Sequence, residues 1–139
     1  AVFREFLQIK PDLHVAGQVR NGTTKGIDEN ALAAYNAPFP DDDHKQGVRQ
    51  FPNLVPGTPR TPSAEPNKEA WKILREWEKP FLCAFSDKDP IFSGVENSFY
   101  KLIPGCKDMP HVTIENAGHF LQEDQPNACV EAILSIKDI

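Results

Sequence analysis

The sequence has no cluster of basic residues and no long apolar run. Fifteen Lys and Arg residues stand against twenty acidic residues, which gives a formal net charge of -5 at pH 7. Nucleic acids and anionic membrane surfaces select basic patches, so this charge pattern argues against both as partners. The sequence also lacks the run of about 18–20 apolar residues that a membrane-spanning helix needs. We therefore expect a protein that binds neither nucleic acid nor membranes.

Secretion signals and metal-binding cysteine pairs are also missing. The first residues, A-V-F-R-E-F-L-Q-I, have no basic start, no long apolar centre and no initiator methionine. Cys83, Cys106 and Cys129 are odd in number and form no C-x-x-C pair, and no Cys–His spacing fits a zinc site. We expect free, mostly buried thiols and a cytoplasmic location. The missing methionine indicates a processed chain or a fragment.

The first half of the sequence shows little regular patterning. About the first 55 residues are expected to be irregular apart from short elements. A short helix or turn is predicted over 45–56, with Val48, Phe51, Leu54 and Val55 close to one face. One such helix is predicted after Asp28, which can cap it, with Ala31, Leu32 and Tyr35 on one face and Pro38 as its stop. Four prolines and no large apolar residue mark 56–67 as a long surface connection.

Regular patterning begins after this connection. Apolar residues at helical spacing alternate with continuous or β-branched apolar runs, which predicts the order helix, strand, helix, strand, helix. This alternation is typical of a parallel sheet covered by helices. Two parallel strands are too few for a stable sheet, so the chain resembles the end of a larger α/β fold. The predicted elements are 67–77, 79–86, 94–105, 111–118 and 125–136.

Ionisable residues follow both predicted strands. S-D-K-D-P, with Asp87 and Asp89, follows the first strand, and N-A-G-H, with His119, follows the second. Ligands gather beyond the C-terminal ends of strands in open parallel sheets. A carboxylate bound to one ring nitrogen would fix the tautomer of His119 and leave the other nitrogen free as a general base. Glu123 and Asp124 are expected to begin the last helix, where acids complement the helix dipole.

These segments resemble the α/β-hydrolase fold, and specifically the haloalkane dehalogenases. A-F-S-D-K-D-P-I and N-A-G-H-F-L-Q-E-D are common across the whole superfamily. A-Y-N-A-P-F-P-D and G-V-R-Q-F-P-N-L-V-P are much more specific to the dehalogenases. The resemblance implies a helical cap region over 1–58, a proline-rich linker over 59–68, and the C-terminal part of the hydrolase core over 69–139.

The resemblance also implies a mechanism. His119 matches the base that activates water, and Asp89 matches the acid that orients it, whereas Asp87 falls outside that role. In this family an aspartate displaces halide to form an alkyl-enzyme ester, which water then hydrolyses without metal or organic cofactor. The expected partners are a small apolar halogenated substrate, water and halide. The residues implied for the apolar substrate pocket are Phe6, Phe51, Pro52, Val55, Ile91, Phe92 and Phe120.

The nucleophile of that mechanism is missing from the sequence. Neither G-x-S-x-G nor G-x-D-x-G occurs, and the family carries its aspartate, the neighbouring Trp and the oxyanion-hole segment upstream of the cap. The predicted cap region contains no tryptophan that could bind halide. Trp71 and Trp77 both follow the linker and are expected to pack against the sheet. We expect the chain to need the missing N-terminal half and to lack turnover alone.

Other readings stay open from the sequence. The same fold serves epoxide hydrolases and esterases, and a relative of the haloacid dehalogenases is a further alternative. An epoxide hydrolase would use cap tyrosines, of which Tyr35 is the candidate before the linker. An esterase would use a serine nucleophile, for which the sequence has no G-x-S-x-G motif. A truncated, non-catalytic chain that binds a complementary half is the remaining alternative, because a two-stranded sheet leaves an open apolar edge.

Overall fold

The computed structural model describes residues 12–136, which divide into two compact units. Residues up to Val19 together with Asp28–Trp71 form unit 1, and Arg20–Ile27 together with Lys72 onward form unit 2. The segment Arg20–Ile27 therefore packs with the C-terminal residues, although it lies within the predicted cap region. Within residues 12–136 no helix has the length and apolar character to cross a membrane.

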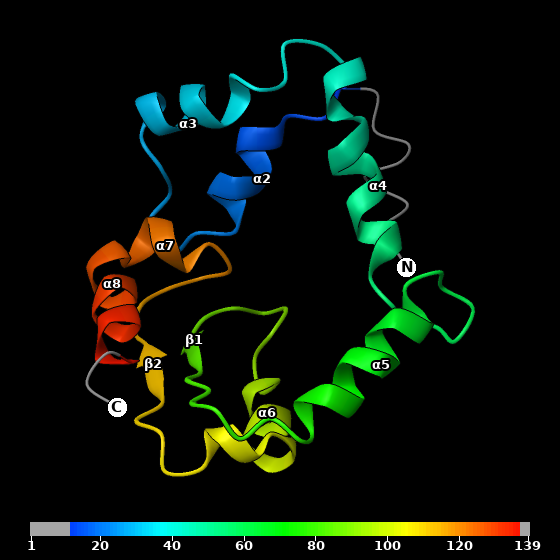
Figure 1. Ribbon diagram of the computed structural model, residues 1–139. Coiled ribbons are helices and arrows are strands. Elements are labelled where there is room, and N and C mark those ends of the chain that lie inside the picture. Colours follow the sequence, from blue (N-terminus) through cyan, green and yellow to red (C-terminus); the bar gives the residue numbers. More distant parts are fainter. Residues whose placement is uncertain (1–11, 137–139) are drawn as a thin grey trace. The chain divides into compact units, whose positions relative to one another are not determined.

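Unit 1 is built from short helices (Figure 1). Asp28 caps α3 as predicted, since its Oδ1 accepts the Ala31 N–H at 2.9 Å. The helix α2, which crosses the border between the units, was not expected; the buried side chains of Ala16 and Val19 stabilise it. The elements are α2 (Val15–Asn21), α3 (Glu29–Asn36), η1 (Asp43–Lys45), α4 (Gln46–Leu54) and α5 (Ala64–Leu74). The short helices expected after Asp28 and within 45–56 are thus confirmed as α3 and α4, and the described part of the first half is more regular than expected.

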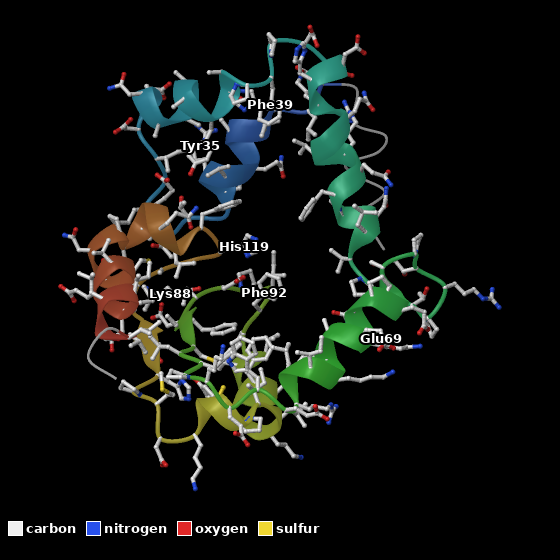
Figure 2. The ribbon with its side chains drawn as sticks, in the orientation of Figure 1. Tyr35, Phe39, Glu69, Lys88, Phe92 and His119 are labelled. Carbon is white, nitrogen blue, oxygen red and sulfur yellow. The ribbon has the colours of Figure 1, made fainter. Side chains whose placement is uncertain are left out.

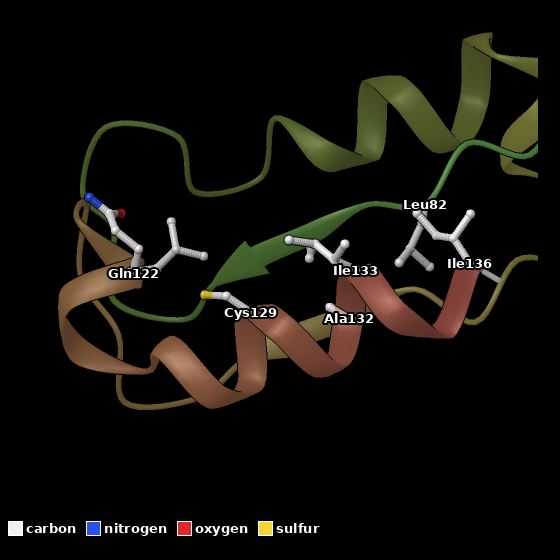
Figure 3. Close-up of a pocket in the computed structure, with 8 residues that line it drawn as sticks. Leu82, Gln122, Cys129, Ala132, Ile133 and Ile136 are labelled. Atoms are coloured by element: carbon white, nitrogen blue, oxygen red, sulfur yellow. The ribbon is translucent and has the colours of Figure 1, made fainter.

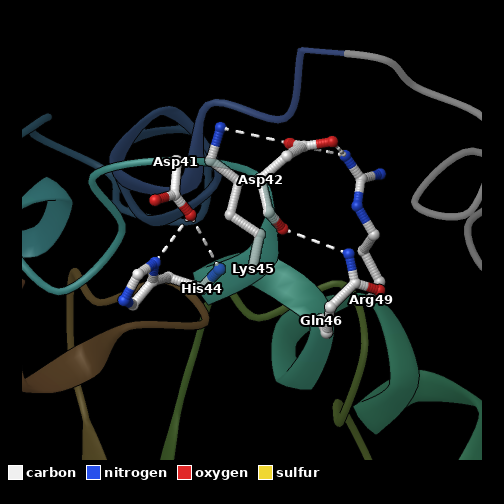
Figure 4. Close-up of polar contacts among 6 residues, drawn as sticks. All are labelled: Asp41, Asp42, His44, Lys45, Gln46 and Arg49. Carbon is white, nitrogen blue, oxygen red and sulfur yellow. Dashed lines mark hydrogen bonds and ion pairs between the residues drawn. The ribbon is translucent and has the colours of Figure 1, made fainter.

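The acidic turn before α4 is organised by local ion pairs. Asp42 accepts hydrogen bonds from the Arg49 guanidinium at 3.1 and 3.2 Å, and Asp41 binds His44 Nδ1 at 2.6 Å (Figure 4). The Arg49 side chain is mostly covered, whereas Asp41 and His44 are more than half exposed. This turn fixes the start of α4, the helix that carries Phe51 and Pro52.

Unit 2 contains the predicted two-stranded parallel sheet. Strands β1 (Ala84–Ser86) and β2 (Val112–Ile114) pair in parallel with Phe85 opposite Thr113, which confirms the predicted topology (Figure 1). Both strands are shorter than expected. Their pairing nevertheless continues past the strand ends, because the Asp87 N–H donates to Ile114 O and the Lys88 N–H to Ala117 O. The other elements are α6 (Glu96–Leu102), η2 (Pro104–Cys106), α7 (Leu121–Asp124) and α8 (Pro126–Ser135).

The core of unit 2 lies between the sheet and α8. Ile114, Ala117 and Ala132 are almost fully buried, and Leu82, Ala84, Val112, Leu121 and Ala128 pack around them. These side chains come from both strands and from the two last helices. Because Ile114 ends β2 and Ala117 lies in the following loop, the core also anchors the start of the segment that carries His119.

Gly105 is the tightest backbone crossing in unit 2 and gives a stability prediction. Its N–H donates to Trp77 O at 2.7 Å and its carbonyl accepts from Phe81 N at 2.9 Å. A Cβ at this position would overlap the carbonyl oxygen of Lys79. We expect Gly105→Ala to lower the free energy of unfolding by about 2–3 kcal/mol, because rigid backbone must move. Urea unfolding followed by tryptophan fluorescence measures this.

The matched control for this prediction is Gly47→Ala in α4. Among the described residues outside its own stretch of helix, no atom lies within 4 Å of the position that its Cβ would take. Alanine is also the better helix former, so this variant should be as stable as the parent or slightly more so. Equal unfolding midpoints for the two alanine variants would contradict the assigned role of Gly105.

Candidate active site

The loops that follow the two strands bring an acid and a histidine together. His119 Nδ1 lies 3.0 Å from Asp89 Oδ2. The Asp89 side chain is 9% exposed and that of His119 is 28% exposed, so the pair sits at a surface opening with the acid inside. A carboxylate can accept hydrogen bonds but cannot donate them. In the neutral ring of His119, Nδ1 therefore carries the proton and Nε2 is the free acceptor. Among residues 12–136, Nε2 has no hydrogen-bond partner.

Asp89 is held as a carboxylate. Its Oδ1 accepts the Ile91 N–H at 2.8 Å, which leaves Oδ2 directed at the histidine. Burial acts to raise the pKa of Asp89, but the hydrogen bonds from the Ile91 N–H and from His119 outweigh it and hold the pKa below its ordinary value. The acid is therefore ionised at neutral pH and able to stabilise an imidazolium ring.

Two aromatic rings enclose the imidazole. Phe92 stacks on His119 with ring centroids 5.6 Å apart, and Phe120 makes a T-shaped contact with it at 5.1 Å between centroids. Figure 2 shows His119 and Phe92 facing each other from separate loops. Ile91 and Phe92 remain 60% and 48% exposed, so their apolar surface is available to a ligand. The sequence placed these residues in an apolar pocket, and that assignment stays a prediction.

The other acid of the first loop, Asp87, contacts the backbone of the second loop. Its Oδ1 accepts the Ala117 N–H at 3.1 Å, and the neighbouring Lys88 ammonium donates to Asn116 Oδ1 at 3.0 Å. Burial acts to raise the pKa of Asp87, but backbone hydrogen bonds from Asn116 and Ala117 outweigh it and lower the pKa. Asp87 does not contact His119. It ties the two strand-end loops together.

The carboxylate of Asp124 is a feature that sequence reasoning missed. It was expected at the start of the last helix, but it ends α7 and is 4% exposed. Its oxygens accept the N–H groups of Gly118, Thr24 and Lys25 at 2.8–3.2 Å. Burial acts to raise its pKa, but these hydrogen bonds hold the pKa below its ordinary value. The contact joins residues about a hundred positions apart, which no local pattern reveals.

The remaining predicted pocket residues belong to unit 1 or lie outside the described residues. Phe51 and Val55 are 72% and 52% exposed, and Pro52 lies between them within α4. Phe6 lies outside the described residues. The exposed apolar side chains of α4 are suited to line a ligand site, and their role there stays a prediction.

Burial raises the pKa values of the Cys83 and Cys106 thiols, so these two are not activated nucleophiles. Cys83 and Cys106 are buried and free, and Cys129 is half-buried and free. Burial is the main cause that raises the pKa of the Cys83 thiol to about 12. His111, beside them, accepts the Cys83 N–H at Nδ1 and lies 3.0 Å from Cys106 O at Nε2, so both ring nitrogens are occupied. In residues 12–136 no group of three His, Cys, Asp or Glu side chains could hold a metal ion.

Curated proteins named haloalkane dehalogenase match the chain. That of Psychrobacter cryohalolentis is 49% identical over 88% of the chain, and that of Mycolicibacterium paratuberculosis is 41% identical over 96%. That of Mycobacterium marinum is 40% identical over 96%. No family model matches. The chain spans only 41%, 44% and 45% of these three relatives.

The matches bear on the fold. They confirm the resemblance read from the sequence and, with the two parallel strands and their covering helices, the assignment to a portion of an α/β-hydrolase fold. We propose roles for individual site residues below.

Proposed function

The chain is homologous to haloalkane dehalogenases over 88–96% of its length, and on this premise we propose that it supplies the water-activating half of such an enzyme. The observation that carries the proposal is the pair of Asp89 and His119. Nδ1 is bound to a buried carboxylate at 3.0 Å, and Nε2 is unpaired within the described residues. This is the arrangement a general base needs.

The proposed reaction has two steps. An aspartate from the part of the protein that this chain does not contain attacks the halogen-bearing carbon, the carbon–halogen bond breaks, and halide leaves with the electron pair. The product is an alkyl ester of that aspartate. His119 Nε2 then takes a proton from water, and the water oxygen attacks the ester carbonyl. The ester carbon–oxygen bond breaks, and the alcohol leaves with the proton from the imidazolium. The aspartic acid that remains releases the second proton of the water to solvent, which restores the carboxylate.

The apolar surroundings of His119 fit this chemistry. Phe92 stacks on the imidazole, and Phe120 makes a T-shaped contact with it. A site from which water is largely excluded strengthens the attraction between Asp89 and an imidazolium ring. An uncharged haloalkane also suits an apolar lining. No cofactor is part of the proposal.

An apolar groove away from the histidine supports the need for further chain. It has a volume of about 320 Å³ and runs between α8 and the segment that leads into β1 (Figure 3). Ile133 and Ile136 on its α8 side are 65% and 42% exposed. Neither Asp89 nor His119 lines it. We propose that in the complete protein the groove and the adjoining strand edge are covered by the remainder of the hydrolase core.

Halide release from a complemented protein tests the proposed function. We define the complemented protein as this chain joined to the part of the Psychrobacter relative that the match leaves uncovered. With 1-bromobutane it should release bromide continuously, because the nucleophile and the base are then in one molecule. The chain alone and the added part alone are the controls, and neither should release bromide continuously. A chain that turns over alone, or a folded complemented protein without bromide release, would contradict the proposal.

A further inference from the structure

Asp124 connects two segments that are far apart in sequence. Its Oδ2 accepts the Gly118 N–H at 2.8 Å, both oxygens lie within 3.0 Å of the Thr24 N–H, and Oδ1 accepts from Lys25 N at 3.2 Å. The Lys25 ammonium donates to the backbone carbonyl of Asp124 at 3.1 Å. We call residues 22–25 the strap. All of these residues belong to unit 2.

The strap also fixes the residues on both sides of the base. The Phe120 N–H donates to Gly22 O at 3.2 Å, and Thr24 Oγ1 donates to Asn116 O at 2.9 Å. The N–H immediately before His119 is bound by Asp124, and the N–H immediately after it is bound by the strap. The backbone on both sides of His119 is therefore held by contacts that are separate from the contact of its ring with Asp89.

Two glycines allow this close approach. A Cβ on Gly22 would lie 2.6 Å from a Phe120 ring carbon, and a Cβ on Gly118 would lie 2.5 Å from Gly22 O. Neither gap accommodates a side chain without movement. The junction thus tolerates little displacement of the loop, and any shift of the strap is transmitted to Gly118 and Phe120.

We propose that Asp124 is a positioning residue for His119, an inference that rests on the proposed function of this histidine as the base. Three N–H groups converge on one side chain, and only a carboxylate offers acceptors on both oxygens. An amide offers one acceptor oxygen and an NH2 group that opposes an N–H. Asp124→Asn therefore removes acceptors at the junction while keeping the size of the side chain. The freed backbone lets the imidazole leave the position from which Nε2 reaches water.

The kinetic test uses Asp124→Asn in the complemented protein. A displaced base slows ester hydrolysis and leaves halide displacement unchanged, because His119 takes part only after halide has left. We expect a burst of about one bromide per protein molecule, followed by turnover reduced about 10- to 100-fold. Glu115→Gln is the matched control, since it removes an exposed acid of the same loop. A folded Asp124→Asn protein with parental turnover, or with both steps slowed equally, would overturn the inference.

A spectroscopic readout separates this inference from the proposed function. The Nδ1 proton of His119, hydrogen-bonded to Asp89, should give a downfield proton resonance that disappears in His119→Gln. This resonance should be lost or broadened in Asp124→Asn and retained in Glu115→Gln. Its retention in Asp124→Asn overturns the positioning role even if the complemented protein releases no halide. Its loss supports the role in the same circumstance.

A second variant keeps the inference testable if Asp124→Asn does not fold. Gly22→Ala leaves the carboxylate and its N–H partners in place but puts a methyl group into the space of the Phe120 ring. It should displace the same loop and give the same bromide burst and the same loss of the Nδ1 resonance. A folded Gly22→Ala protein with parental turnover and an unchanged resonance would show that the junction does not position His119.

Discussion

Replacing His119 by alanine in the complemented protein is expected to stop steady bromide release while leaving a burst of about one bromide per molecule. Displacement of halide by the aspartate needs no base, whereas attack of water on the ester does. General-base catalysis contributes about 10²- to 10⁴-fold, and turnover should fall by that factor. Bromide measured after rapid mixing gives the burst and the steady rate in one experiment, and mass spectrometry should detect the retained alkyl group.

His44 provides a matched control for this prediction. It also pairs with an aspartate, at 2.6 Å between Nδ1 and Asp41 Oδ1, but on an exposed turn of unit 1. His44→Ala should therefore turn over like the parent. If His119→Ala kept the parental steady rate, His119 would not be the base. If it abolished the burst as well in a folded protein, the histidine would serve the first step, against the proposal.

Replacing Asp89 by asparagine is the second prediction with a large effect. The carboxylate fixes the proton on Nδ1 and stabilises the imidazolium that forms on water attack. A neutral amide supplies no charge, and its NH2 group can bind the ring in the wrong tautomer. We expect turnover to fall about 10²- to 10⁴-fold, again with the bromide burst preserved. The steady rate of bromide release measures the loss.

The control for Asp89→Asn is the same change at Asp41. Both acids bind a histidine Nδ1, but the Asp41 side chain is 59% exposed and that of Asp89 is 9% exposed. Asp41→Asn should leave turnover unchanged. Parental turnover in a folded Asp89→Asn protein would show that the acid does not support the base. If Asp89→Asn and Asp41→Asn lose the same thermal stability but only Asp89→Asn loses turnover, the lost turnover is not caused by impaired folding.

The two predictions together distinguish a base from its orienting acid. The histidine variant lacks the proton acceptor at every pH. In His119→Ala, the space that the imidazole ring vacates can hold an added imidazole molecule. Asp89→Asn retains its own ring, so this space stays filled. A high concentration of imidazole should therefore restore more activity to His119→Ala than to Asp89→Asn. Greater rescue of the asparagine variant would contradict the assigned roles.

The sequence was a good guide where local pattern and topology coincide. The apolar run before Ser86 and the β-branched residues around Val112 predicted two strands, and parallel pairing follows when a helix connects them. Parallel strands end at one edge of a sheet, so residues just beyond them become neighbours. This is why Asp89 and His119 could be placed together before their distance of 3.0 Å was known.

Local pattern failed where distant segments supply the stabilisation. Helix α2 has little amphipathic signal of its own, yet the Ala16 N–H finds an acceptor on Asn36 at 3.1 Å. The predicted surface connection ends earlier than its prolines suggested, because α5 already begins at Ala64 and contains Pro66 within its first turn. In α2, a tertiary contact outweighed residue propensity. In α5, the proline is tolerated because it lies in the first turn of the helix.

The sequence by itself determined the parallel α/β character, the two strand-end loops and the resemblance to dehalogenases, because strand periodicity and short motifs are local properties of the chain. Only the tertiary structure decided that residues 22–25 belong with the C-terminal unit and that Asp124 holds the N–H before His119. An acid at a helix start and an acid that accepts three backbone N–H groups have the same sequence signature. Which of them forms depends on the donors that folding brings within hydrogen-bonding distance.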